Sequence, residues 1–171
     1  VSDTLNHRVQ RFTGRGELLG GWGRFGDGDG EFNMPWGVAV DELGDVYVAD
    51  WRNHRVQKFT AEGEFVFTFG SAGTGRGEFN GPAGIAVDGD GDIYVVDSGN
   101  DRVQLFRQDG SYVQQFRGDA TLSNSARRAF TTSHTTLLRG REESNLEDQK
   151  LFRRPRGIAV DDERRMFVAD F

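Results

Sequence analysis

Apolar residues along this chain gather in short runs that turn-forming residues separate. In the middle of the sequence, four runs rich in Val, Tyr and Phe occupy 37–41, 46–50, 55–59 and 64–69. The segments 42–45 and 60–63 between them contain Gly and acidic residues, as expected for tight turns between strands. The first two runs are almost continuously apolar, which is typical of strands covered on both faces. The pattern predicts a four-stranded antiparallel sheet packed between other layers.

The same runs recur along the chain in one phase. The copies of three motifs occupy 37–41, 84–88 and 157–161; 46–50, 93–97 and 166–170; and 6–10, 53–57 and 100–104. The repeat is 47 residues long, except for one interval of 73 residues between positions 84 and 157. Repeats of about 40 to 50 residues with four strands each are typical of β-propeller blades.

The repeated residues resemble the NHL repeat, which is named for an Asn-His-Leu signature. The three motifs have the consensus Pro-x-Gly-(Val/Ile)-Ala-Val-Asp, (Val/Ile)-Tyr-Val-(Ala/Val)-Asp and Asn-His-Arg-Val-Gln. The resemblance covers nearly the whole chain apart from 118–152. It implies a six-bladed propeller, of which this chain would form about half. It implies little about function, because the repeat is a generic scaffold.

We therefore expect an all-β chain that forms a partial β-propeller of about three four-stranded antiparallel blades. The expected units are a partial blade over 1–35, a full blade over 36–82, a full blade with an insertion over 83–155, and a partial blade over 156–171. An open arc of blades leaves a sheet edge and an apolar face uncovered. We expect a longer chain to supply the remaining blades, and a second copy of this chain is the alternative.

The insertion at 118–152 interrupts the repeat. It lacks strand alternation, but Ser123, Asn124 and Ser144 are residue types that start helices, so we expect one or two short helices. Eight Lys or Arg residues and five acidic residues lie between 118 and 156. A basic loop of this length either adds binding contacts or is a solvated insertion.

Composition and charge narrow the functional classes. The 171 residues include 21 Lys and Arg against 27 Asp and Glu, a formal net charge of -6. This balance is opposite to the basic footprint of nucleic-acid-binding proteins, so the net charge disfavours RNA as a partner. The absence of cysteine excludes disulfides and thiolate metal sites. No apolar run approaches the roughly 18 residues of a membrane helix, so we expect no membrane partner, and localisation stays open.

Three motifs suggest ligand chemistry but fit the repeat better. The segment 88–92, Asp-Gly-Asp-Gly-Asp, resembles the start of a calcium loop, but Ile93 and Gly99 stand where that loop needs Gly and Glu. The segment 21–26 matches the dinucleotide fingerprint but leads into no helix. His7 and His54 are equivalent, but the third copy has Asp101, which argues against a repeated zinc site. We predict no metal, no cofactor and no catalytic residue.

A recurrent set of polar residues follows the second run of each repeat. Its members are Asp50, Asn53 and Arg55 in one copy and Asp97, Asn100 and Arg102 in the next. We expect a structural turn in which Asn caps the bend and Arg bonds the Asp at the end of the strand.

Two sets of connections share one face of a propeller and supply its ligand contacts. The loops into the innermost strands contribute Met34, Trp36, Ala83, Arg154 and Arg156, and the turns after the second strands contribute Trp51, Arg52, Ser98, Gly99 and Asp101. Trp and Arg dominate binding energy at interfaces. The predicted ligand-binding face is therefore Trp36, Trp51, Arg52, Asp101, Arg154 and Arg156. Alternatively, Trp36 fills space between blades and Trp51 covers a strand edge.

The leading functional hypothesis is a non-catalytic NHL-type binding module that presents this face to a protein or peptide. Two alternatives remain open. One is part of a metal-dependent lyase or hydrolase propeller whose ligands come from other blades. The other is an RNA-binding NHL propeller, which the basic segment 118–156 favours and the net charge disfavours.

Overall fold

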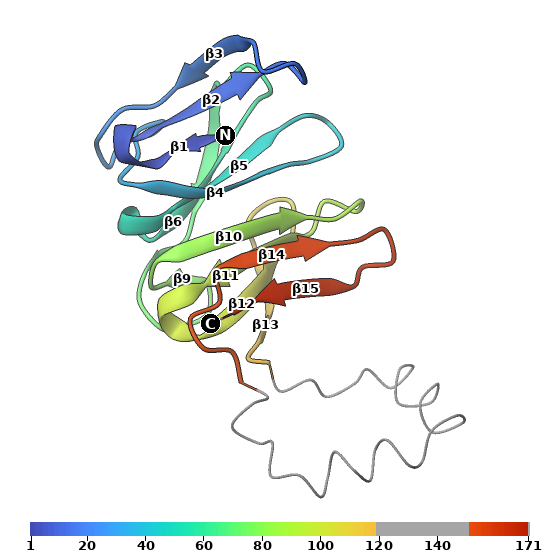
Figure 1. The fold of residues 1–171 in the computed structure, drawn as a ribbon. Coiled ribbons are helices and arrows are strands. Elements are labelled where there is room, and N and C mark those ends of the chain that lie inside the picture. Colours follow the sequence, from blue (N-terminus) through green and yellow to red (C-terminus); the bar gives the residue numbers. More distant parts are fainter. Residues whose placement is uncertain (119–150, 171) are drawn as a thin grey trace, which may run out of the picture.

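The computed structural model describes residues 1–118 and 151–170. Within these residues the strands form four blade-like sheets and one short parallel pair (Figure 1). The elements are, sheet by sheet, β1 (Ser2–Asp3), β2 (Arg8–Phe12) and β3 (Leu18–Trp22); β4 (Pro35–Val40), β5 (Val46–Asp50), β6 (Arg55–Phe59) and β7 (Phe65–Phe69); β10 (Pro82–Val87), β11 (Ile93–Asp97), β12 (Arg102–Phe106) and β13 (Tyr112–Phe116); β14 (Gly157–Val160) and β15 (Met166–Ala169); and the pair β8 (Ser71–Ala72) and β9 (Glu78–Phe79).

The two four-stranded sheets are copies of one another. Their strands follow the orders β4-β5-β6-β7 and β10-β11-β12-β13, and all neighbours are antiparallel. The register is also equivalent, since Val46 faces Phe59 in one sheet and Ile93 faces Phe106 in the other. Strands β5 and β11 are buried at every position, as their continuous apolar sequences predict. The predicted all-β, partial β-propeller fold is confirmed.

The first strand of each complete sheet starts two residues earlier than the apolar runs indicate. Pro35 in β4 pairs with Asp50, and Pro82 in β10 pairs with Asp97. The register then shifts before the regular pairing of β4 with β5 and of β10 with β11 resumes. This irregularity admits a proline, which has no N–H to donate to a ladder.

The core of the molecule lies between the sheets. The three clusters of buried side chains are Val9, Phe32, Val46, Val48 and Phe59; Tyr47, Val56, Phe79, Ile85, Ile93, Val95 and Phe106; and Tyr94, Val96, Val103 and Leu105. Each cluster joins side chains from two successive sheets. In the third cluster, the side chains from the next sheet are Ile158, Val160, Met166 and Val168 of β14 and β15. Burial of these apolar faces is the main force that holds one blade against the next.

The innermost strands β4, β10 and β14 approach one another closely at a recurrent glycine. A Cβ atom added to Gly84 would lie 2.6 Å from the Arg156 carbonyl oxygen and 3.2 Å from the Ile158 nitrogen. The equivalent Gly37 meets the carbonyl oxygen of Ala83 in the same way. The glycine of the Gly-Val/Ile-Ala-Val-Asp motif therefore lets the backbones of successive blades come together.

A short 3-10 turn follows the second strand of each repeat. These turns are η1 (Thr4–Asn6), η2 (Trp51–Asn53) and η3 (Ser98–Asn100). The next residue, His7, His54 or Asp101, has a left-handed backbone with φ of 53°, 53° or 51°, a conformation for which His and Asp are enriched. Because the strands are antiparallel, the turns lie at the same end of the sheets as the loops that lead into β4, β10 and β14.

The predicted insertion begins and ends at neighbouring positions. The Phe152 backbone N–H donates a hydrogen bond to the Arg117 carbonyl oxygen at 3.0 Å, which brings the chain back to the edge of the third sheet. Residues 119–150, which include the predicted helix starts at Ser123, Asn124 and Ser144, lie outside the described residues. In the described part of the chain, no helix is long and apolar enough to cross a membrane.

Candidate functional site

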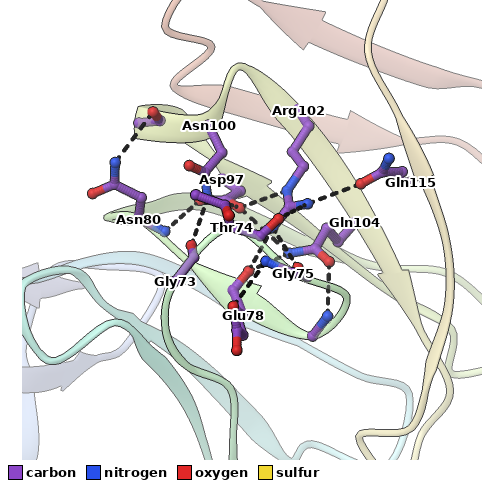
Figure 2. A network of polar contacts seen from close by, with 12 residues as sticks. Gly73, Thr74, Gly75, Glu78, Asn80, Asp97, Asn100, Arg102, Gln104 and Gln115 are labelled. Atoms are coloured by element: carbon purple, nitrogen blue, oxygen red, sulfur yellow. Dashed lines mark hydrogen bonds and ion pairs between the residues drawn. The ribbon is translucent and has the colours of Figure 1, made fainter.

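A buried hydrogen-bond network centred on Asp97 adjoins the predicted ligand-binding face (Figure 2). The Asp97 carboxylate accepts hydrogen bonds from Asn100 Nδ2 and Arg102 Nε, both at 2.8 Å, and from the Asn80 backbone N–H at 2.7 Å. Arg102 is 2% exposed. Its remaining guanidinium nitrogens donate to Gln115 Oε1 and to the carbonyl oxygens of Thr74, Gly75 and Glu78. The network therefore ties the turn η3 to the loop that joins the second and third sheets.

The second sheet repeats this network around Asp50. Arg55 Nε donates to Asp50 Oδ2 at 3.0 Å and Asn53 Nδ2 donates to the same oxygen at 2.8 Å. Asn53 also donates to the Gly26 carbonyl oxygen at 2.8 Å, and η2 begins without a side-chain cap. Asn53 thus closes the turn onto Asp50 and also bridges to the preceding loop, and the expected Arg–Asp bond is present.

The environment of the carboxylate differs from blade to blade. At the exposed Asp3, hydrogen bonds from Arg8 and Asn6 lower the pKa of the carboxyl group. At Asp50, burial raises the pKa, and the hydrogen bonds from the Asn33 N–H, Asn53 and Arg55 oppose this rise. The Asp50 copy of the motif therefore bears a desolvation cost, which its hydrogen bonds from Asn33, Asn53 and Arg55 offset in part.

A second recurrent contact fixes the residue that follows each turn. His7 Nδ1 accepts a hydrogen bond from the Met34 N–H, and His54 Nδ1 accepts one from the Gly81 N–H, both at 3.1 Å. In the third copy, Asp101 Oδ1 accepts a hydrogen bond from the Arg154 N–H at 2.7 Å. Each turn is thereby hydrogen-bonded to the loop that precedes the next sheet. We call these contacts the His/Asp latch.

An open pocket of about 750 Å³ lies where these turns and loops meet. Its lining comes from η2, η3 and the loops ahead of β4, β10 and β14. The lining residues are Asn33, Trp51, Arg52, His54, Asn80, Gly81, Ser98, Gly99, Asp101, Arg154 and Arg156.

Two tryptophans and two arginines stack along the side of this pocket. The Trp36 and Trp51 rings have centroids 5.7 Å apart and are tilted by 60°. The Arg52 guanidinium lies 5.4 Å from the Trp51 ring centroid, and the Arg156 guanidinium lies 5.8 Å from that of Trp36. We call this arrangement the Trp–Arg stack. Cation–π contacts of this kind hold flexible arginine side chains over rings at a partly solvated surface.

The structure brings most of the predicted face residues together. Trp51, Arg52, Asp101, Arg154 and Arg156 line the pocket, as do the secondary candidates Ser98 and Gly99. Trp36 is 39% exposed and joins the face through its contacts with Trp51 and Arg156. Ala83 is buried and only 4% exposed, and neither it nor Met34 lines the pocket.

Sequence reasoning missed four lining residues: Asn33, His54, Asn80 and Gly81. The two asparagines occupy equivalent positions of successive repeats, Asn33 one residue before Met34 and Asn80 three residues before Ala83, and this recurrence was the signal available. The Asn80 carbonyl oxygen accepts a hydrogen bond from the Gly99 N–H at 2.8 Å, and the Asn33 carbonyl oxygen accepts one from the Arg52 N–H at 3.1 Å. These bonds draw the loop residues into the pocket wall.

The motifs with apparent metal or nucleotide chemistry lie elsewhere. Asp88 Oδ1 accepts hydrogen bonds from the Asp90 and Asp92 N–H groups, which closes the turn between β10 and β11 at the opposite end of the sheet. Gly21 lies in β3, which leads into a loop. Among the described residues, no group of three or more His, Asp or Glu side chains is placed to hold a metal ion.

Two segments of the chain match a known repeat family. Residues 32–59 and 79–106 match the NHL repeat. These two segments of the chain are NHL repeats. Each matched segment runs from a buried phenylalanine, Phe32 or Phe79, to the end of β6 or β12. It includes the Asp, Asn and Arg residues of one of the two networks, which we call the Asp–Asn–Arg networks. No curated protein matches the chain by sequence.

Solved propeller structures resemble this chain in fold. A streptogramin B lyase has a TM-score of 0.59 at 14% identity, with 99% of this chain and 43% of that chain covered. A catalytically inactive virginiamycin B lyase from Staphylococcus aureus with quinupristin has a TM-score of 0.60 at 13% identity, with 99% and 44% covered. The WD40 repeats of RRP9 have a TM-score of 0.54 at 15% identity, with 67% and 34% covered.

These likenesses show the fold alone, because the identities are low. This chain spans less than half of the length of each of the three solved chains.

Proposed function

We propose that this chain is part of a non-catalytic NHL-type propeller that binds a protein or peptide segment. The binding face consists of the pocket between η2 and η3 and the Trp–Arg stack beside it. The remaining blades are proposed to come from a longer chain.

The observation that carries this proposal is the Trp–Arg stack. Aromatic and arginine side chains supply most of the binding energy at protein interfaces. Here Trp36, Trp51, Arg52 and Arg156 contact one another at the rim of an open pocket. Their mutual contacts restrict their rotamers before a partner arrives, which lowers the entropy cost of binding.

The framework beneath the face also favours binding. The Asp–Asn–Arg networks hold the turns through hydrogen bonds between side chains and to loop carbonyl oxygens, and the His/Asp latch joins each turn to a backbone N–H of the next loop. Side chains that vary from repeat to repeat are thus displayed on a rigid support, which is how repeat proteins present binding surfaces.

The test is a selection of peptides from a random phage-displayed library against the chain. We expect the enriched peptides to lose at least about tenfold in affinity when Trp51→Ala or Trp36→Ala removes an aromatic anchor. Leu43→Ala is the matched control, because Leu43 is 77% exposed and lies in the β4–β5 turn at the opposite end of the sheet. Absence of enrichment, or equal binding to the tryptophan variants, would overturn the proposal.

A further inference from the structure

The binding face changes from tryptophan at the start of β4 to arginine ahead of β14, with Arg52 and Arg156 lying over the tryptophan rings. We infer from this division that its ligand is a peptide segment with an oxyanion next to an apolar side chain. In this arrangement Trp36 and Trp51 contact the apolar side chain. Arg52, Arg154 and Arg156 bind the oxyanion. The inference rests on the proposed function and names its ligand class.

The division arises from positions that are equivalent in successive repeats. The position that Trp36 occupies in one repeat is occupied by Ala83 in the next repeat and by Arg156 in the one after it. Two residues before these positions, Met34 is followed by Gly81 and then by Arg154. At these two positions the chain is therefore apolar at the start of β4, has small residues at the start of β10 and is cationic ahead of β14.

The charge of the pocket is opposite to that of the chain. Arg52, Arg154 and Arg156 line it together with a single carboxylate, Asp101, while the whole chain has a formal charge of -6. One oxygen of Asp101 is already used, because it accepts the Arg154 N–H at 2.7 Å. A positive pocket on an acidic surface selects a negatively charged group and repels cationic segments.

The residue type narrows the ligand further. A guanidinium binds a planar carboxylate or a phosphate through paired N–H donors, and this geometry is more specific than that of an ammonium. The rings of Trp51 and Trp36 hold the Arg52 and Arg156 guanidiniums in place. Preordered guanidiniums beside exposed rings match a segment in which a Glu, Asp or phosphorylated residue neighbours an aromatic or aliphatic one.

A nucleic acid fits this face less well. Phosphate-backbone binding needs a track of many cationic contacts, whereas the described cations of the pocket form one patch across one turn, η2, and the loop ahead of β14. The net charge of the chain opposes a long polyanion. A short acidic peptide can be bound by this single patch of three arginines.

The experiment measures peptide binding by fluorescence polarisation on the full chain. The probes are a labelled decapeptide with one Trp beside three Glu, the same peptide with Gln in place of Glu, and the same peptide with phosphoserine in place of Glu. A single-stranded uridine dodecamer is the nucleic-acid probe. The proportion of acidic residues in the peptides enriched by the phage selection is a second readout, which does not depend on the design of the probe peptides.

We expect the glutamate or phosphoserine peptide to bind at least about fivefold tighter than the glutamine peptide. Whichever of the two binds more tightly identifies the oxyanion as carboxylate or phosphate. Arg154→Gln and Arg156→Gln should each remove most of this preference. Arg107→Gln should leave it unchanged, because Arg107 is exposed in the β12–β13 turn at the far end of the sheet.

Asp101→Asn should change the affinity for the acidic peptide in the direction opposite to the arginine variants. Asn keeps an oxygen that can accept the Arg154 N–H and tolerates a left-handed backbone, while the negative charge is removed. We expect the acidic peptide to bind about threefold tighter to this variant, with no loss of thermal stability. Unchanged or weaker binding would contradict the charge argument.

The outcomes separate this inference from the proposed function. If peptides bind in a Trp51-dependent manner but show no preference for acidic residues, the face binds peptides and the oxyanion assignment is wrong. If the selection and all peptide probes fail, the proposed function itself is wrong. Tighter binding of the uridine dodecamer, with a steep salt dependence, would replace the peptide by RNA.

Discussion

The Asp101 carboxylate accepts a hydrogen bond from the Arg154 backbone N–H at the position where His54 accepts one from Gly81. A neutral imidazole and a carboxylate can both accept one N–H, and both side chains tolerate the left-handed backbone after the 3-10 turn. This equivalence explains why the NHL repeat here has His in two copies and Asp in the third. The recurrent histidine is a hydrogen-bond acceptor between blades.

The His/Asp latch predicts the effect of replacing His54. In His54→Ala the Gly81 N–H loses its acceptor, and Gly81 is buried, so we expect a loss of about 1–3 kcal/mol in the free energy of unfolding. The left-handed φ of 53° adds strain to an alanine there. In His54→Asn an acceptor and a tolerant backbone are retained, and the loss should stay below about 1 kcal/mol. Urea denaturation of the two variants measures the difference.

His54→Gly separates the two causes of this loss. Glycine relieves the backbone strain but offers no acceptor. If the glycine variant is as stable as the asparagine variant, the hydrogen bond contributes nothing and the latch is not a stabilising contact.

The latch also shows the limit of sequence reasoning. The repeat phase predicted the blades because four apolar runs and three motifs recur together in one register. It also predicted that Arg55 and Asp50 would meet, because both belong to one turn. The partners of His54 and Asp101 lie 27 and 53 residues further along the chain. No local pattern indicates which of two loops a turn will contact, so this bond required the structure.

The Asp–Asn–Arg network occurs at three levels of burial, which predicts a graded response to removal of its arginine. The side chains of Arg8, Arg55 and Arg102 are 46%, 12% and 2% exposed. Arg102→Ala leaves the fully buried Asp97 carboxylate without its ionic partner, which costs about 3–5 kcal/mol. Arg8→Ala breaks an exposed pair and should cost less than about 1 kcal/mol. Arg55→Ala should lie between them.

Thermal and urea denaturation of the three alanine variants test this order. The motif residues are identical in type, so they form a matched set in which the extent of burial varies. Equal losses in Arg8→Ala and Arg102→Ala would show that burial of the network does not determine its contribution to stability.

The candidate face was only partly predictable for a related reason. Residue type and loop position pointed to Trp36, Trp51 and Arg156, and the structure places them in one stack. The contact between Trp36 and Arg156 spans the innermost strand of the sheet between them, β10. Such proximity follows from the convergence of inner strands at their glycines, a three-dimensional property that the linear repeat does not contain.

The close approach of the inner strands predicts that Gly84→Ala will lower the stability of the fold and also disturb the contact between Arg156 and Trp36. The new Cβ would lie 2.6 Å from the Arg156 carbonyl oxygen, so β14 must move away from β10. We expect a loss of about 1–3 kcal/mol in the free energy of unfolding, together with altered tryptophan fluorescence because Arg156 withdraws from Trp36. Gly14→Ala is the control, since nothing lies within 4 Å of its added Cβ, and its effect should stay within about 0.5 kcal/mol. If Gly84→Ala behaves like Gly14→Ala in both measurements, the close approach of β10 and β14 does not position Arg156.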